Sequence, residues 1–130
     1  MPLKSTIEKA HKDAREGKSP STQAGEFVHE EIDRIRKGEH GARSAKQAIA
    51  IGLSEARRAG VKLPPPKNGS PEVIKKAEQD SKAAVNHKKV SRKRSQATTK
   101  ALKREGSAAV SHSALSEQAR SAARRRTKTT

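Results

Sequence analysis

The sequence predicts an all-α protein in which a small N-terminal helical hairpin or three-helix module carries a basic, partly disordered or loosely helical C-terminal arm. Apolar residues recur at helical spacing, and Ser, Pro and Gly stand where helices begin and end. Ile, Leu, Val and Phe make up only 18 of the 130 residues, too few for a highly charged chain to close one large core. Compact folding is therefore expected in only part of the chain.

The two halves of the chain differ in charge and in apolar content. The net charge is +16, from 30 Lys and Arg against 14 Asp and Glu. Residues 64–130 contribute +12 of this charge, whereas 11 of the 18 large apolar residues precede residue 64. These differences predict a helical module over 1–63, a Pro- and Gly-rich linker over 64–71 and a basic arm over 72–130.

The first helix is predicted from Ser5 to Gly17. Ser5 and Glu8 have the spacing of a capping box, and Gly17 is a stop signal. Its apolar stripe consists of Leu3, Ile7, Ala10 and Ala14. Because this stripe is thin, the helix is expected to need a partner.

The second helix is predicted from Ser19-Pro20, a cap followed by proline in the first turn, to Lys37, with Gly38 as its stop. Its apolar face consists of Ala24, Phe27, Val28, Ile32 and Ile35.

The third helix has the clearest pattern, with a capping box at Ser44 and Gln47 and a stop at Gly60. Its apolar repeat consists of Ala45, Ala48, Ile49, Gly52, Leu53 and Ala56. A short loop makes the second and third helices a hairpin, which is expected to bury Phe27, Val28, Ile32 and Ile35 against Ile49 and Leu53. Ile51 lies about 160° around the third helix from Ile49, so one partner helix cannot cover both. Either the first helix or the Val61–Leu63 segment covers Ile51, or a second protomer or another protein does.

The third helix also resembles a known family. The run from Ser44 to Gly60, SAKQAIAIGLSEARRAG, resembles the signature segment of a family of short bacterial proteins of unknown function. Residues 25–32, GEFVHEEI, look like the same relatives, so the resemblance covers about residues 19–66. It implies no catalytic or binding residue. The second half is similar in composition to bacterial histone-H1-like tails.

Beyond the linker, a helical pattern with a thin apolar stripe starts at Ser70-Pro71, and an alanine-rich helix is predicted over about 113–125. Between them, residues 86–104 contain eight basic side chains and no acid. These eight spread over most of a helical circumference, which predicts a segment that is disordered when free and ordered on a polyanion.

Such a segment binds nucleic-acid phosphates, DNA or RNA, without reading bases. The predicted contacts are Lys88, Lys89, Arg92, Lys93, Arg94, Lys100, Lys103, Arg104, Arg120, Arg124, Arg125 and Arg126. Base reading by Arg43, Lys46 and Gln47 at the start of the third helix is a minor alternative, because Gln47 also serves as a cap. In the other alternative the protein is an interaction adaptor, and helix 44–60 docks through Ile51 to a partner or forms a homodimer.

Other function classes have little support in the sequence. Cys, Trp and Tyr are absent and Phe27 is the single aromatic residue, which removes thiol chemistry and aromatic stacking platforms. There is no nucleophile elbow, no Gly-rich phosphate loop and no convincing metal-ligand spacing. We therefore expect a non-enzymatic protein without metal or cofactor. No targeting or membrane segment is evident, so the expected location is the cytoplasm, at the nucleoid if DNA is the partner, with no membrane contact.

Overall fold

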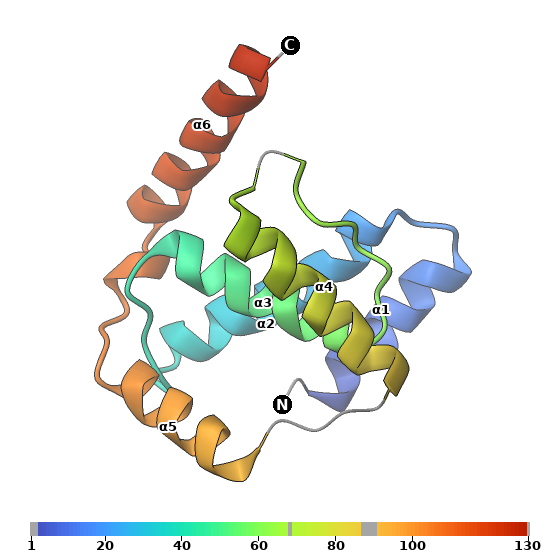
Figure 1. Ribbon diagram of the computed structural model, residues 1–130. Helices are drawn as coiled ribbons and strands as arrows, with labels where there is room; N and C mark the ends of the chain where they lie inside the picture. The colour runs from blue at the N-terminus through green and yellow to red at the C-terminus, as the bar shows by residue number, and fades with distance from the viewer. Residues whose placement is uncertain (1–2, 68, 87–90, 130) are drawn as a thin grey trace.

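The computed structural model describes residues 3–67, 69–86 and 91–129, and all regular structure in these ranges is helical (Figure 1). The helices are α1 (Lys4–Arg15), α2 (Pro20–Arg36), α3 (Ala45–Arg58), α4 (Pro71–Asn86), α5 (Arg92–Lys103), the 3-10 turn η1 (Ala108–Val110) and α6 (His112–Thr129). The predicted all-α class is confirmed. None of the described helices is long and apolar enough to cross a bilayer.

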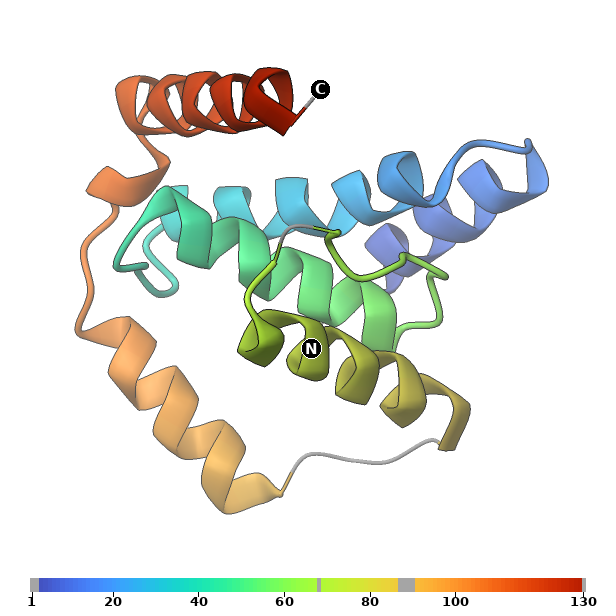
Figure 2. The same ribbon diagram turned by 45° about the horizontal axis from the view of Figure 1, so that its top comes forward.

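The first four helices pack in chain order. α2 and α3 run in opposite directions and form the central pair, α1 packs against α2, and α4 packs against α3 (Figure 2). The apolar pairing of α2 with α3 that the sequence predicts is thus the centre of the fold. α4 extends the packing beyond residue 63, although the division into module, linker and arm stays a prediction.

The starts and stops of α2 and α3 are confirmed. The Ser19 hydroxyl accepts from the Thr22 N–H, and the Ser44 hydroxyl accepts from the Gln47 N–H at 3.1 Å. Gly38, two residues beyond α2, has a φ of 82°, a left-handed conformation that other residues adopt only at a cost.

The predicted start of α1 is wrong. α1 begins at Lys4 with Leu3 as its N-cap and no side-chain cap, so Ser5 lies inside the helix. A buried carboxylate replaces the capping box, because Glu30 Oε1 accepts from the Leu3 N–H at 2.5 Å and from the Thr6 hydroxyl at 3.0 Å. A contact from α2 therefore holds the start of α1. The apolar stripe is also thinner than predicted, since Leu3 and Ala14 are exposed.

The main apolar cluster surrounds Phe27, which is fully buried. It contains Ala10 of α1, Ala24 and Phe27 of α2, Ala56 of α3, and Val61, with Ile7, Leu53 and Leu63 packed at its edge. The Arg57 guanidinium holds the segment after α3 by donating to the carbonyls of Leu63 and Pro64. Ile7, Val61 and Leu63 thus pack around Phe27 and do not belong to a cluster over Ile51.

α3 faces α2 with its smallest residues. Ala48, Gly52 and Ala56 are buried, whereas Ile49 and Leu53 are only partly buried. A Cβ on Gly52 would lie 2.6 Å from Val28 Cα, so the two helix backbones are in close contact there. The sequence predicted the large residues of this repeat as the core, and the small residues instead set the packing.

α4 buries more than its thin stripe predicted. Ala77, Asp80 and Ala83 are buried on its α3-facing side. The Asp80 carboxylate accepts from the Ser54 hydroxyl at 2.7 Å, from Arg58 Nε at 2.7 Å and from Lys76 Nζ at 2.8 Å. A buried polar contact therefore fixes α4 on α3.

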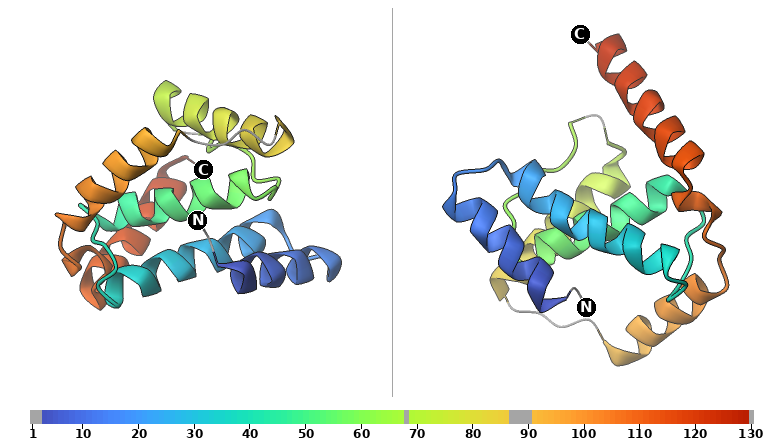
Figure 3. Two further views of the ribbon diagram at one scale, coloured as in Figure 1. Left: turned by 90° about the horizontal axis from the view of Figure 1, so that it is seen from below. Right: turned by 180° about the vertical axis from the view of Figure 1, so that it is seen from behind.

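The C-terminal part of the chain is anchored at the loop between α2 and α3. Val110 is 1% exposed and packs in a second cluster with Ile35, Ala42 and Ala48. The N–H groups of Gly41 and Ala42 donate to the carbonyls of Leu102 and Gly106. Leu102–Val110 is therefore an anchor segment from which α5 and α6 extend in different directions (Figure 3).

Candidate nucleic-acid interface

Among the described residues, those of α5 form the most exposed helix. Every residue from Ser91 to Ala101 is exposed, and Leu102 is the one partly buried side chain before the helix ends. In the described part of the chain, α5 packs against no other helix. The sequence predicted disorder here, whereas the structure has a helix whose first turn is capped by the Ser91 hydroxyl.

α5 has one side that faces a groove and an opposite side on which three cations lie. Ser91, Arg94, Ser95, Thr98, Thr99 and Leu102 line a groove that α5 forms with α3 and α4. At about 100° per residue, Lys93, Lys100 and Arg104 fall within about 40° of one another, on the opposite side of the helix. We call these three cations the outward stripe. The sequence did not predict a stripe, because only the position of the groove gives α5 an inside and an outside.

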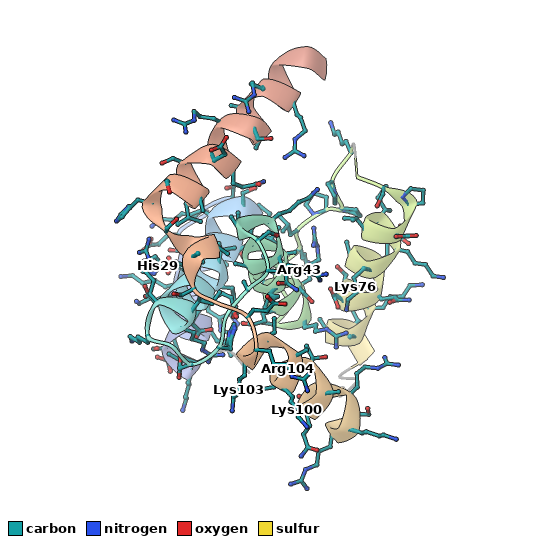
Figure 4. All side chains as sticks on the ribbon, turned by 90° about the vertical axis from the view of Figure 1, so that its left-hand side faces the viewer. His29, Arg43, Lys76, Lys100, Lys103 and Arg104 are labelled. Atoms are coloured by element: carbon teal, nitrogen blue, oxygen red, sulfur yellow. The ribbon has the colours of Figure 1, made fainter. Side chains whose placement is uncertain are left out.

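The outward stripe has no carboxylate partner among the described residues. Several cations of the first four helices are used structurally instead, as Arg58 and Lys76 are on Asp80. Figure 4 shows Lys100 and Lys103 on α5 and Arg104 directly after it, away from Lys76 on α4. The α5 cations are therefore available to an external polyanion.

α6 carries a second, smaller basic surface. Its partly buried residues, Ala114, Leu115, Gln118, Ser121 and Ala122, share one face. Arg120 and Arg124 are exposed and lie about 160° and about 120°, respectively, from the centre of that face. Arg125 is exposed nearer the packed face, and the side chain of Arg126 lies outside the described residues, as do Lys88 and Lys89. Because α5 and α6 diverge from the anchor segment, the predicted contacts form two surfaces.

At the start of α3, polar groups of Ser44 and Gln47 are used to cap the helix. Gln47 Oε1 accepts from the Arg43 N–H at 2.6 Å while the Gln47 N–H donates to Ser44. The reciprocal bond of the predicted capping box thus goes to Arg43 in place of Ser44. With its Oε1 engaged in this way, Gln47 cannot also make the bidentate contact by which a glutamine reads adenine.

Ile51 is partly buried and lines the groove between α3, α4 and α5. The sequence proposed α1, the Val61–Leu63 segment or a second molecule as its cover. In the structure the walls beside it belong to α4 and α5.

A cluster of ionisable side chains lies under the groove, and sequence reasoning missed it. Glu31 is 1% exposed, and its Oε1 lies 2.6 Å from His40 Nε2. Burial, together with the charge of Glu31 and a hydrogen bond with it, raises the pKa of Glu55 to about 8. No spacing rule pairs Glu31 with Glu55, because they come from different helices. Among the described residues no group of three or more His, Cys, Asp or Glu can hold a metal ion.

The pKa of Asp80 is shifted in the opposite direction from that of Glu55. Burial alone would raise the pKa of Asp80, but hydrogen bonds from Lys76 and Ser54, with the charge of Lys76, outweigh it and lower that pKa. Asp80 is therefore an ionised structural carboxylate, unlike Glu55.

These observations define a small all-helical protein with a packed N-terminal part and exposed basic helices. Residues 4–67 match a family of unknown function (DUF6496), a range that covers α1, α2 and α3 and ends before α4. The match agrees with the predicted resemblance to an uncharacterised family and adds α1 to its range. No curated protein and no solved structure matches the chain.

Proposed function

We propose that this protein binds nucleic acid through the phosphates, mainly without regard to base sequence, and that the outward stripe of α5 is its principal contact. Arg92, Arg94 and Lys103 flank the stripe, and Arg120 and Arg124 of α6 provide a second contact. The proposal describes a non-enzymatic, nucleoid-associated-like protein of the cytoplasm. The string from Ser44 to Gly60 is proposed as the signature of its family.

The observation that carries the proposal is the exposure of six cations on and directly after a helix that packs against no other helix. They are Arg92, Lys93, Arg94, Lys100, Lys103 and Arg104, and none has a carboxylate partner within the described ranges. Lys and Arg displace the counterions condensed on a duplex, so such a helix gains affinity for any sequence. The engaged Oε1 of Gln47 and the lack of aromatic side chains on α5 favour phosphate contacts over base reading.

The test is the salt dependence of duplex binding. Replacement of Lys93, Lys100 and Arg104 by Ala is expected to weaken binding to unrelated duplexes equally. The slope of log affinity against log salt should fall by up to about 0.9 for each phosphate that the variant no longer neutralises. Fluorescence anisotropy with two labelled duplexes of different sequence measures both quantities, and the same titration with an RNA duplex compares the two nucleic acids.

The charge-matched control replaces Lys4, Lys9 and Arg15, three exposed cations of α1, by Ala. This variant has the same net charge as the stripe variant, so it should keep most of the affinity and most of the salt slope. Equal losses in the two variants would mean that the total charge, and not the stripe, determines binding.

The adaptor hypothesis has one observation in its favour, since Ile51 lies on the wall of an open groove. If the parent protein binds neither duplex, the adaptor becomes the better proposal. Ile51→Asp should then remove a protein partner or a homodimer, detected by light scattering and by co-purification.

A further inference from the structure

The loop between α2 and α3 connects the buried ionisable cluster to the anchor segment. The backbone N–H of Gly41 donates to the Leu102 carbonyl at 2.9 Å, and that of Ala42 donates to the Gly106 carbonyl at 3.0 Å. A Cβ on Gly41 would collide with the backbone of Glu105, so the loop and the anchor are in direct contact. The position of the α5 end therefore depends on the conformation of this loop.

His40 holds the same loop through contacts of its two ring nitrogens. Its Nδ1 lies 2.9 Å from the Gly41 carbonyl oxygen, and its Nε2 lies 2.6 Å from Glu31 Oε1. A carbonyl oxygen only accepts, so Nδ1 carries a hydrogen. The contact between Nε2 and Glu31 then needs a second proton, on either the imidazole or the carboxyl group.

The Glu55 carboxyl group is a third place in this cluster that can carry a proton. Burial, the charge of Glu31 and hydrogen bonding with Glu31 raise the pKa of Glu55 to about 8, so below that pH one of the two carboxyl groups is protonated. The Oε2 atoms of Glu31 and Glu55 are both buried and have no hydrogen-bond partner among the described residues. When that proton leaves, two buried carboxylates face each other across the α2–α3 contact, which is unfavourable.

The surrounding charges do not compensate for this loss. Glu30 of α2 adds negative charge and is itself paired with Arg34 at 3.7 Å. The positive charge of the chain's α-amino group opposes the rise in the pKa of Glu55 without cancelling it. A single proton therefore determines whether the contact between Glu31 and Glu55 is attractive or repulsive.

We propose that Glu31, His40 and Glu55 form a proton latch: while the proton between the two glutamates is present, the loop holds the anchor segment and α5 in place, and its loss releases them. The proposal concerns the position of α5 and does not rest on nucleic-acid binding. It makes the protein responsive to mildly alkaline pH.

The experiment measures the position of α5 at different pH values. The chain has no Cys, so Lys46→Cys on α3 and Ala97→Cys on α5, both at exposed positions, introduce two unique sites for spin labels. Distances between the labels are recorded by pulsed electron resonance from pH 6.5 to 9.5. The distribution should be narrow at low pH and should broaden with a midpoint near pH 8, the pKa of Glu55.

The decisive variant is Glu55→Gln in the labelled protein. Its amide keeps a donor toward Glu31 at every pH, so the distribution should stay narrow to pH 9.5. Because the α-amino group titrates in the same range, this variant separates the two groups. The matched control, Glu72→Gln, makes the same change on the exposed face of α4 and should broaden like the parent. Broadening of Glu55→Gln like the parent, or no broadening of the parent, would overturn the latch.

A direct measurement covers the case in which Glu55→Gln does not fold. The carbon shift of the Glu55 carboxyl, followed by NMR in the parent, gives its titration midpoint. The latch requires this midpoint to agree with that of the distance change. Midpoints more than one pH unit apart would contradict it.

Discussion

Gly52 is the residue at which α2 and α3 come into closest contact. The Cβ that any other residue would add there lies 2.6 Å from Val28 Cα and 2.9 Å from Val28 Cγ2. Backbone atoms cannot rotate away as a side chain can, so the helices must separate to accept even a methyl group. The hairpin therefore depends on the absence of a side chain at this position.

Gly52→Ala is expected to lower the free energy of unfolding by about 1–3 kcal/mol, because overpacking exceeds the gain in helix propensity. Gly25→Ala on α2 is the control, since a Cβ there meets no atom within 4 Å. It should raise stability by about 0.5–1 kcal/mol. Urea denaturation followed by circular dichroism measures both, and a stabilised Gly52→Ala would contradict the close contact.

Glu55 makes the stability of the fold depend on pH. Its folded pKa, about 8, lies above the ordinary value of 4.5, so the folded state binds the extra proton between these values. Its contribution is therefore complete below about pH 4.5 and is lost as the pH rises through 8. We expect the parent to lose stability relative to Glu55→Gln between about pH 4.5 and 8 in urea denaturation, with little further change above pH 8. A constant difference between the two proteins would contradict the raised pKa.

The sequence predicts apolar faces better than it predicts buried charge. Phe27 and Ile35 were expected in the core and are fully buried. Glu30 and Glu31 were not expected there, because an acidic pair on an amphipathic helix normally lies in solvent. Glu30 is buried because it accepts hydrogen bonds from the start of α1, and Glu31 is buried against His40. Both contacts join residues that the sequence pattern does not bring together.

Among the elements, those with local start and stop signals were predicted best. α2 and α3 begin at the predicted serines because a serine cap satisfies the first N–H groups of its own helix. α1 was misplaced because its start depends on Glu30, a residue distant in sequence. Burial of α4 was underestimated for the same reason, since Asp80 finds its partners on α3.

Asp80→Ala is expected to detach α4 while leaving the rest of the module folded. It removes the common acceptor of Ser54, Arg58 and Lys76, a loss of about 1–3 kcal/mol because two of these donors remain partly solvated. Hydrogen exchange should show faster exchange in α4 and unchanged protection in α2. Glu78→Ala, an exposed acid on the same helix, is the control. Unchanged exchange in α4 would show that its alanines alone hold it.

For the whole molecule, Val110 connects the basic arm to the module. Val110→Ala should lower the exchange protection of the Gly41 and Ala42 N–H groups, with a loss of about 1.5–3 kcal/mol from the removed methyl groups and the cavity left behind. Val85→Ala, at a 78% exposed position, should have no effect. Equal loosening of α1 and α2 would mean that the anchor segment belongs to the main core.

The overall layout follows from the sequence only in part. Composition places the charge in the second half, and α5 and α6 carry it. Composition does not reveal the anchor segment, because Val110 is one isolated apolar residue among serines and alanines. Its burial requires the pocket that Ile35, Ala42 and Ala48 form, which exists only once α2 and α3 have folded.

The anchor segment also affects how the two basic helices would act under the proposed function. α5 and α6 leave one fixed point in different directions, so they present two binding surfaces on a short common support (Figure 1). When one surface holds a nucleic acid, the other is kept at a high effective concentration near the same strand or a neighbouring one. Two weak, sequence-independent contacts would then combine into avidity, and a long duplex or two adjacent duplexes would be held more tightly than a short one.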